Sequence, residues 1–406
     1  MTVSTWQQAH RAQETAYDVI VVGGGIVGCS AAYWLSREAP SLDVALLEAR
    51  TLGAEASGRN AGFILQGTHT DYRTDMDRYG TDTARRLWAF TRENRDLLAA
   101  ELEGTAFGWQ SEGSLTAAGD ADEARRLQSS LSHLRTAGAP AVYLDAAETN
   151  QRIDATGFHG GLYVTTGAVV NPLQLLHHLV SESNVDVHTQ HPVHRVQWRG
   201  RGTMLDTPDR RFRAGQVVLA VGPALPEIVP EAAAFVQPVR AQMLATARAD
   251  ALHIPVPVYS HEGGFYVRQH TDGRVLVGGG RHSHREAEAT DRDATTPAVQ
   301  ATIERYLHTH FPWSQSLPIE QRWSGTMGFS PDGRPVVGRV PDHPEGVFAT
   351  GFTGHGMGYG FRMGRLLADA VADGGLPEAM DLFAASRFRE ERTSDADSTA
   401  PRPADS

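Results

Sequence analysis

Residues 18–28 have the sequence DVIVVGGGIVG, and much of the fold follows from them. The first five are a short apolar run, which is typical of a buried parallel strand. The glycines that follow fit the pattern G-x-G-x-x-G at Gly23, Gly25 and Gly28. In this pattern the first glycine permits a tight turn, the second lets the backbone approach a pyrophosphate, and the third lets a helix pack on the strand. The stretch therefore predicts a dinucleotide-binding turn, followed by a helix over residues 26–37.

An acidic residue follows at the spacing that this turn requires. Residues 43–47, which are apolar after Asp43, predict a second parallel strand that ends immediately before Glu48. A carboxylate about 20 residues after the fingerprint accepts hydrogen bonds from the ribose hydroxyls of a dinucleotide. The amides at the start of the helix are expected to face the phosphates. Besides the glycines, the cofactor contacts predicted from this unit are Ile26, Val27, Glu48, Ala49 and Arg50.

A second glycine-rich segment favours FAD over a nicotinamide, since the first fingerprint serves both cofactors. Residues 53–63, GAEASGRNAGF, offer backbone amides, a hydroxyl and a guanidinium within one short stretch. Such a loop can bind a pyrophosphate and reach the isoalloxazine ring of a flavin. The predicted contacts here are Ser57, Arg59, Asn60, Ala61 and Gly62.

A third glycine-dense segment lies at residues 349–360, ATGFTGHGMGYG, between a strand predicted over 347–350 and a helix predicted over 361–372. Amides that precede a helix suit an anion, and a reduced flavin is anionic around N1 and O2. No second G-x-G-x-x-G stands between a strand and a helix, so we expect the electrons to come from the substrate rather than from NADPH. The predicted contacts are Gly354, His355, Gly356, Met357 and Gly358.

Together these segments resemble the D-amino acid oxidase superfamily of flavoproteins, which includes glycine oxidase, sarcosine oxidase and gamma-glutamylputrescine oxidase. Two further motifs agree: residues 161–172, which contain GAVVNP, and residues 217–223, VVLAVGP. The stretch 323–338 is also similar in kind, and the resemblance extends from about Tyr17 to Gly375. It adds the following residues to the predicted FAD contacts: Val193, Ala220 and Gly222.

The resemblance implies an α/β fold in which a Rossmann-like FAD-binding domain is interleaved with a substrate domain on a mixed or antiparallel sheet. The FAD-binding domain is expected from residues 15–85, 155–225 and 325–385, and the substrate domain from residues 86–154 and 226–324. Residues 81–103 predict an amphipathic helix. Residues 265–269 and 274–278 predict a hairpin that floors the substrate cavity. Residues 1–14 and 393–406 are expected to be flexible tails.

Members of this superfamily oxidise a carbon–nitrogen bond, generally by hydride transfer to flavin N5, which leaves an imine. The cofactor carries the hard step, and no dedicated base is required when the amine arrives neutral. The candidate catalytic residues are His355 in the glycine turn, with Tyr266 and Arg268, which share one face of the hairpin opposite Val267. Packing would also explain Tyr266, and His355 could instead cap a helix or face solvent. Two other functions stay open: oxidation of a hydroxy acid by the same fold, and a non-catalytic flavin-binding subunit.

The departures from the family pattern concern the substrate and the electron acceptor. Glycine oxidase and its relatives carry a carboxylate-binding arginine a few residues after a tryptophan like Trp323, where this chain has Met327. A thioether cannot make that bidentate contact, so a simple free amino acid is not expected as the substrate unless another arginine substitutes, with Arg268 and Arg73 as candidates. The lysine by which sarcosine oxidases promote reaction with oxygen is absent, and Leu276 takes its place. The resemblance therefore implies an amine or amino acid oxidase or dehydrogenase, whose flavin is reoxidised by oxygen or another acceptor.

The same comparison bears on how FAD is attached. The loop where some relatives carry a linking histidine has the sequence Gly58-Arg59-Asn60, and there is no C-terminal cysteine. FAD is therefore expected to bind non-covalently.

The composition excludes several other classes of function. The net charge of −11 argues against a nucleic-acid partner. No stretch approaches the roughly 20 apolar residues of a membrane span, and residues 1–16 lack the apolar core of a signal peptide, so a cytoplasmic protein is expected. The single cysteine, Cys29, and histidines without carboxylates at ligand spacing predict no metal site. All 37 basic residues are arginine, which excludes lysine Schiff-base chemistry. The predicted partner is a small amine or amino-acid-like substrate, and the oligomeric state is open.

Overall fold

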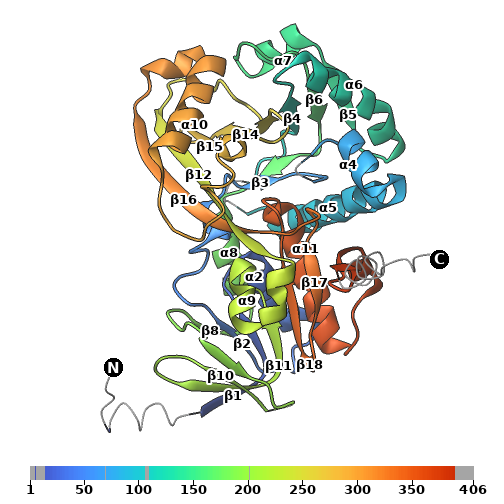
Figure 1. The fold of residues 1–406 in the computed structure, drawn as a ribbon, viewed down its shortest axis with the longest axis vertical. Helices are drawn as coiled ribbons and strands as arrows, with labels where there is room; N and C mark the ends of the chain where they lie inside the picture. Colours follow the sequence, from blue (N-terminus) through green and yellow to red (C-terminus); the bar gives the residue numbers. More distant parts are fainter. Residues whose placement is uncertain (1–4, 6–13, 69, 106–108, 201, 389–406) are drawn as a thin grey trace, which may run out of the picture.

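The computed structural model describes residues 5, 14–68, 70–105, 109–200 and 202–388. Two eight-stranded sheets make up most of it, one in the lower and one in the upper half of Figure 1. The mixed α/β architecture predicted from the sequence is confirmed. The predicted tails, residues 1–14 and 393–406, lie outside the described residues apart from Thr5 and Glu14.

The lower sheet contains the first predicted strand at its centre. Its order is β17-β18-β11-β1-β2-β8, and β10 and β9 extend it from β11. All strands from β18 to β8 along this order are parallel, whereas β17 is antiparallel to β18. The strands are β1 (Glu14–Val22), β2 (Val44–Leu47), β8 (Asp186–His188), β9 (Arg195–Gln197), β10 (Thr203–Asp206), β11 (Arg211–Leu219), β17 (Val336–Val340) and β18 (His343–Thr350).

Strand β1 is apolar on both faces because both faces of this sheet are covered. Val19 and Val21 pack against helices in one core, and Ile20 and Val22 pack into a second core on the other side. This is the pattern expected of a strand in a parallel sheet that is buried on both faces.

The upper sheet has the order β16-β12-β15-β14-β13-β4-β6-β5 and is antiparallel except where β13 meets β4. Val267, Val275 and Val277 of its central hairpin pack into a core with helix α10, and Tyr259 and Tyr266 lie on the opposite face. The strands are β4 (Ser114–Ala117), β5 (Ala141–Leu144), β6 (Gly161–Val164), β12 (Gln237–Arg248), β13 (Val258–Ser260), β14 (Phe265–Gln269), β15 (Arg274–Gly279) and β16 (Ile319–Phe329). A separate two-stranded sheet pairs β3 (Phe63–Ile64) with β7 (Ala168–Val169).

The helices cover both sheets. They are α2 (Ile26–Glu38), α3 (Ala56–Arg59), α4 (Tyr72–Tyr79), α5 (Thr81–Leu102), α6 (Ala121–Thr136), α7 (Ala146–Arg152), α8 (Pro172–Ser181), α9 (Leu225–Ile228), α10 (Pro297–His310) and α11 (Gly356–Ala372). Short 3-10 helices are η1 (Gly222–Ala224), η2 (Pro230–Ala234), η3 (Arg281–Ser283), η4 (Pro312–Ser316) and η5 (Glu378–Phe383). Within the described residues, none of these helices is both long and apolar enough to cross a membrane.

Helices α2 and α11 pack closely although they lie at opposite ends of the chain. A Cβ on Gly364 would stand 2.4 Å from the Cβ of Ser30, so only glycine allows this approach. The hydroxyl of Ser30 donates a hydrogen bond of 2.6 Å to the carbonyl oxygen of Phe361. These contacts cover the first predicted helix with the last one.

Most element boundaries agree with the sequence within a few residues, with one clear correction. The helix predicted over residues 361–372 begins at Gly356, inside the segment predicted as a turn. Gly358 and Gly360 both lie inside this helix. A Cβ on Gly358 would stand 2.6 Å from the side chain of His355, and a Cβ on Gly360 would stand 2.6 Å from the side chain of Ile26. These glycines provide space for packing rather than ending the helix.

The domain boundaries stay a prediction, and two strands show where they differ from the sheets. Strand β6 falls in the predicted FAD-binding segment 155–225 but pairs with β4 and β5 in the upper sheet. Residues 325–329, also placed in the FAD-binding domain, end strand β16 and pair with β12.

Candidate functional site

A cavity of about 990 Å³ is lined by residues from both sheets, at the upper end of the roughly 300–1,000 Å³ usual for ligand pockets. One wall contains residues at the carboxyl ends of β1, β2, β11 and β18. The other contains residues of β13, β14 and β16 and of the loops that follow β13 and β15. In open α/β sheets ligands bind outside the carboxyl ends of the strands, so this cavity is the candidate site.

The first glycine turn forms the floor of the cavity at the end of β1. Gly23 has φ of 111°, and a Cβ there would stand 2.4 Å from the carbonyl oxygen of Ala220. A Cβ on Gly28 would stand 1.8 Å from the carbonyl oxygen of Gly23. Gly28 does not line the cavity, and it lets α2 begin directly beneath the turn.

Glu48 lies beside this turn, where β2 ends. One carboxylate oxygen accepts a hydrogen bond of 2.7 Å from the amide of Gly24, and the other accepts one of 2.7 Å from the amide of Arg50. Arg50 itself pairs with Glu55, also on the cavity lining. The carboxylate is therefore fixed at the rim, where the sequence predicts the ribose.

The second glycine-rich segment forms a tight turn against the first. The hydroxyl of Ser57 accepts a hydrogen bond of 3.0 Å from the amide of Ile26. Asn60 shapes the turn: its side chain donates to the carbonyls of Ala56 and Ser57, both at 2.9 Å, and accepts from the amide of Gly62 at 2.6 Å.

Two predicted contacts in this segment lie outside the lining. The guanidinium of Arg59 pairs with Asp293 at 2.8 Å and donates to the carbonyl of Ser324 at 2.8 Å, so it joins the loop to the upper sheet. Gly62 has φ of 76° and supports the turn from behind, because a Cβ there would stand 2.0 Å from the carbonyl oxygen of Val170.

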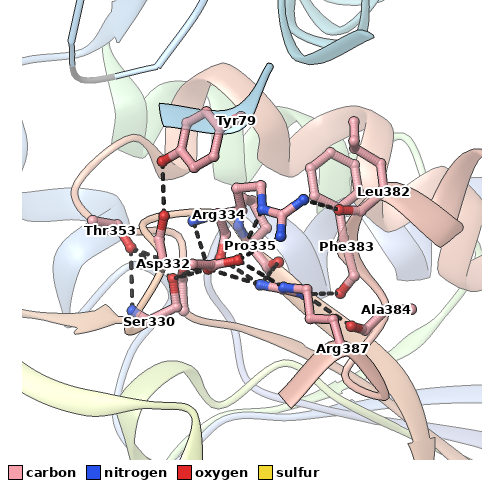
Figure 2. A network of polar contacts seen from close by, with 11 residues as sticks. Tyr79, Ser330, Asp332, Arg334, Pro335, Thr353, Leu382, Phe383, Ala384 and Arg387 are labelled. Carbon is pink, nitrogen blue, oxygen red and sulfur yellow. Dashed lines mark hydrogen bonds and ion pairs between the residues drawn. The ribbon is translucent and has the colours of Figure 1, made fainter. Parts of the chain in front are cut away.

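The C-terminal glycine turn completes this wall. A polar network, drawn in Figure 2, supports it from the far side. The carboxylate of Asp332 accepts hydrogen bonds from the guanidinium groups of Arg334 and Arg387, the shortest at 2.8 Å. Ser330 donates from its amide to the hydroxyl of Thr353 at 3.2 Å. Burial alone would raise the pKa of Asp332, but Arg387 and Arg334 outweigh it and bring the pKa below its ordinary value.

His355 lies at the start of α11 and is buried. Its Nε2 atom lies 3.4 Å from the carbonyl oxygen of Leu65, and no side-chain hydrogen bond caps the helix. Burial lowers the pKa of His355 to about 4, although the Leu65 carbonyl acts in the opposite direction. The imidazole is therefore neutral at physiological pH, and it lines the cavity rather than facing bulk solvent.

An aromatic group forms the opposite wall. Tyr259 and Tyr266 are cross-strand partners with ring centroids 6.1 Å apart, and the ring of Phe63 lies 5.4 Å from Tyr259. Gly278 leaves room for this arrangement, since a Cβ there would stand 2.3 Å from the ring of Tyr266. Burial raises the pKa of Tyr266 to about 12, and it raises the pKa of Tyr259 further. Both phenols are therefore protonated and can donate hydrogen bonds.

The structure does not bring Arg268 or Arg73 to the cavity. Arg268 is 4% exposed, and its guanidinium donates to the carbonyls of Ala61 and Val170 at 2.8 and 3.3 Å. Its burial lowers the pKa of the guanidinium to about 10. Arg73 lies on α4 and pairs with Asp77. By contrast Met327, at the position of the family's arginine, does line the cavity.

Of the predicted cofactor contacts, all but three line this one cavity, although their role as contacts stays a prediction. The cavity-lining ones are Gly23, Gly25, Ile26, Val27, Glu48, Ala49, Arg50, Ser57, Asn60, Ala61, Val193, Ala220, Gly222, Gly354, His355, Gly356, Met357 and Gly358. The exceptions are Gly28, Arg59 and Gly62.

Several cavity residues were missed from the sequence. They lie in the two loops of the upper sheet: His261 and Glu262 after β13, and Arg281, His282 and Arg285 after β15. His261 and Glu262 have φ of 54° and 55°, an uncommon conformation for residues other than glycine. The signal for the second loop was present, since three glycines and an arginine end the predicted hairpin.

The donor set suits a dinucleotide better than a metal. Among the residues that the structure describes, no group of three or more histidine, cysteine or acidic side chains could bind a metal ion. Gly25 keeps the cradle open, because a Cβ there would stand 3.0 Å from the hydroxyl of Ser57. The backbone amides at the start of α2 can bind a pyrophosphate, because the glycines beside them carry no side chain that would block its approach. Glu48 lies beside this turn, where it could bind the ribose next to the pyrophosphate.

Known proteins resemble this chain in sequence. Residues 18–370 match the DAO family model, described as FAD dependent oxidoreductase. The chain is 26% identical to gamma-glutamylputrescine oxidoreductase of Escherichia coli, over 90% of this chain and 86% of that protein. It is 25% identical to glycine oxidase of Geobacillus kaustophilus, over 87% of this chain and 93% of that protein.

Solved structures have the same fold. The crystal structure of glycine oxidase from Geobacillus kaustophilus matches with a TM-score of 0.75 at 21% identity, covering 90% of this chain and 99% of that one. L-alpha-glycerophosphate oxidase from Mycoplasma pneumoniae with FAD bound matches with a TM-score of 0.71 at 20% identity, covering 88% and 95%. The resemblance inferred from the sequence is thus confirmed: the chain belongs to the DAO family of FAD-dependent oxidoreductases.

Proposed function

We propose that this protein binds FAD non-covalently and oxidises the carbon–nitrogen bond of an amine or amino-acid-like substrate to an imine. One observation carries the proposal: a single cavity extends from the glycine cradle at β1 to the aromatic wall of the upper sheet. A cofactor bound in the cradle and a substrate against the tyrosines would therefore share one enclosed space.

The cradle residues would hold the cofactor, with Glu48 at the ribose and the turn before α11 at the flavin. When bound, FAD would supply the acceptor for a hydride, which carries the two electrons of the oxidation. The chain supplies orientation and exclusion of water, through the aromatic wall and the buried turn at His355.

The ionisable groups of the cavity indicate how the substrate must arrive. Tyr259 and Tyr266 stay protonated, and His355 is neutral with its ring against a carbonyl. None of the three is poised to act as a strong general base near neutral pH. The substrate amine is therefore expected to bind in its neutral form, and kcat/KM should rise with pH until the amine has lost its proton.

The names of the relatives support an amine substrate. Gamma-glutamylputrescine oxidoreductase and glycine oxidase are both named for compounds that carry an amine. A neutral amine accepts a hydrogen bond, which the protonated tyrosines of this cavity can donate.

Anaerobic titration of the FAD-loaded protein tests the proposal. Purified protein is titrated with amines, amino acids and 2-hydroxy acids while the flavin absorbance is followed. Bleaching by an amine supports the proposal, and readmission of air shows whether oxygen reoxidises the flavin. Bleaching by hydroxy acids alone would assign oxidation of a hydroxy acid instead. A protein that binds FAD but is bleached by none of these donors would contradict the proposed reaction and favour a non-catalytic flavin subunit.

A further inference from the structure

Arg281 lines the cavity where strands β15 and β16 end. It is the first residue of η3, directly after β15, and it follows Gly280, whose φ of 72° turns the chain toward the cavity. Its guanidinium carbon lies 4.6 Å from the ring centroid of Phe329, the last residue of β16. Both residues line the cavity. The charge is thus held against an aromatic ring at the junction of two strands.

Within the part of the chain that the structure describes, no carboxylate contacts this charge, and Glu288 acts on it only through space. Among the described residues, Arg281 forms no ion pair and no side-chain hydrogen bond with any carboxylate, and its neighbour Arg285 adds like charge. Burial is the largest effect on Arg281 and lowers the pKa of its guanidinium. A desolvated charge is costly unless it is paired. By contrast Arg240, a buried guanidinium of this region, is paired at 2.6 Å with Glu288.

The loop that carries Arg281 is anchored at several points. Glu288 is fully buried and accepts from the guanidinium of Arg240 at 2.6 and 2.9 Å and from the amide side chain of Gln242 at 3.0 Å. Further along, Asp293 pairs with Arg59 of the cofactor loop at 2.8 Å. Both carboxylate oxygens of Glu288 are taken up by Arg240 and Gln242, so Glu288 attracts Arg281 from a distance without forming an ion pair with it. The same contacts limit the movement of the loop, which keeps the free guanidinium at the cavity.

The other arginine candidates are excluded by their contacts. Arg268 is engaged with two backbone carbonyls, and Arg73 pairs with Asp77 away from the cavity. Met327, at the family's position, has no charge to offer. Arg285 also lines the cavity but is exposed, whereas Arg281 is half-buried and held against Phe329. Arg281 is therefore the better-placed cavity arginine for a ligand.

We propose that Arg281 binds the carboxylate of the substrate, so that this enzyme selects amines that carry a carboxylate from a different element than its relatives use. The proposal rests on the proposed function and adds a specificity-determining residue to it. A guanidinium can make two parallel hydrogen bonds to a carboxylate, and the contact with Phe329 holds this one at the cavity. Tyr266, whose protonated hydroxyl lies on the same wall, is available for a further hydrogen bond to the ligand.

The test measures binding without turnover, so that it is independent of the oxidation reaction. FAD-loaded protein is titrated with benzoate and 2-furoate, and separately with benzamide and 2-furamide, which have the same shape without the charge. Changes in the visible flavin spectrum and calorimetry report the affinity. Wild type is compared with Arg281→Met, with Arg281→Lys, and with Arg274→Gln. Arg274 is a suitable control because it lies on β15, outside the cavity, and pairs with Asp272 and Glu320.

We expect the wild type to prefer carboxylates over amides. Arg281→Met should weaken carboxylate binding by at least about 30-fold, the effect of removing one partner of a desolvated charge pair. It should leave amide binding within about twofold, which is below the scale of a lost hydrogen bond. Arg281→Lys should lie between the two, and Arg274→Gln should behave as wild type. If Arg281→Met does not retain FAD, Arg281→Gln replaces it.

Three results would overturn the proposal: no carboxylate binding by the wild type, equal binding of carboxylates and amides, or unchanged carboxylate affinity in Arg281→Met. None of them would contradict C–N oxidation, which the anaerobic titration with amines decides separately.

Discussion

Replacement of His355 by glutamine should remove a pH-dependent part of the free energy of unfolding. Burial lowers the pKa of His355 to about 4 in the folded protein, whereas an unfolded histidine titrates near 6.5. Between these values the unfolded chain binds a proton that the folded chain does not. The contribution of His355 to stability is therefore complete above about pH 6.5 and is lost as the pH falls toward about 4. A difference of about 2.5 pH units, at about 1.4 kcal/mol each, corresponds to roughly 3.5 kcal/mol.

The measurement is urea-induced unfolding, followed by tryptophan fluorescence at intervals between about pH 4.5 and 8. It uses protein stripped of flavin, because a ligand in the cavity would add its own pH dependence. The free energy of unfolding of the wild type should fall more steeply on acidification than that of His355→Gln. The exposed His159 provides a control, since His159→Gln should retain the wild-type slope. Equal slopes for the wild type and His355→Gln would refute the reasoning.

Three further perturbations concern the cofactor cradle and its support. Glu48→Gln should raise the Kd for FAD by about tenfold, as expected for the loss of one charge-assisted hydrogen bond, measured by quenching of flavin fluorescence. Gly28→Ala should yield no folded flavoprotein, because its Cβ would stand 1.8 Å from a carbonyl oxygen of the turn, whereas Gly375→Ala, with open space around it, should be purified yellow. Asp332→Asn should cost about 2–4 kcal/mol of stability at pH 7 by chemical denaturation. Because the folded pKa of Asp332 is depressed, that cost should shrink below about pH 3.8, and a cost independent of pH would contradict it.

The cofactor side of the cavity could be predicted from the sequence because the backbone conformation there depends on residues that are close together in the chain. Gly23 needs a positive φ and Gly28 needs close approach to the turn, and both requirements appear as glycines at fixed spacing. The start of α11 could not be predicted in this way. Gly358 and Gly360 resemble turn residues in the sequence, and only the positions of His355 and Ile26 show that they make room inside a helix.

The substrate side depended on tertiary structure. Strand alternation correctly placed Tyr266 on the face opposite Val267, but it could not tell how far along the strand the cavity extends. Arg268 lies on the same strand as Tyr266, but its guanidinium donates a hydrogen bond to the backbone carbonyl of Ala61 in the cofactor loop. The accessible arginine, Arg281, lies beyond the end of the next strand, and its position depends on Phe329 from a distant segment.

The close packing of α2 and α11 has a consequence for biosynthesis. Ser30 and Phe361, which share a hydrogen bond, are separated by 331 positions in the sequence. The centre of the lower sheet also cannot form before β11 and β18 have been synthesised, because β1 pairs with β11 and β11 pairs with β18. On the ribosome, the glycine fingerprint emerges well before the elements that cover it, which are β11 (Arg211–Leu219), β18 (His343–Thr350) and α11 (Gly356–Ala372). The nascent chain must therefore expose the apolar faces of β1 and α2 through most of translation, when chaperones can bind them. Flavin uptake should follow release of the chain, and a premature stop codon before α11 should leave an unfolded product rather than a smaller flavoprotein.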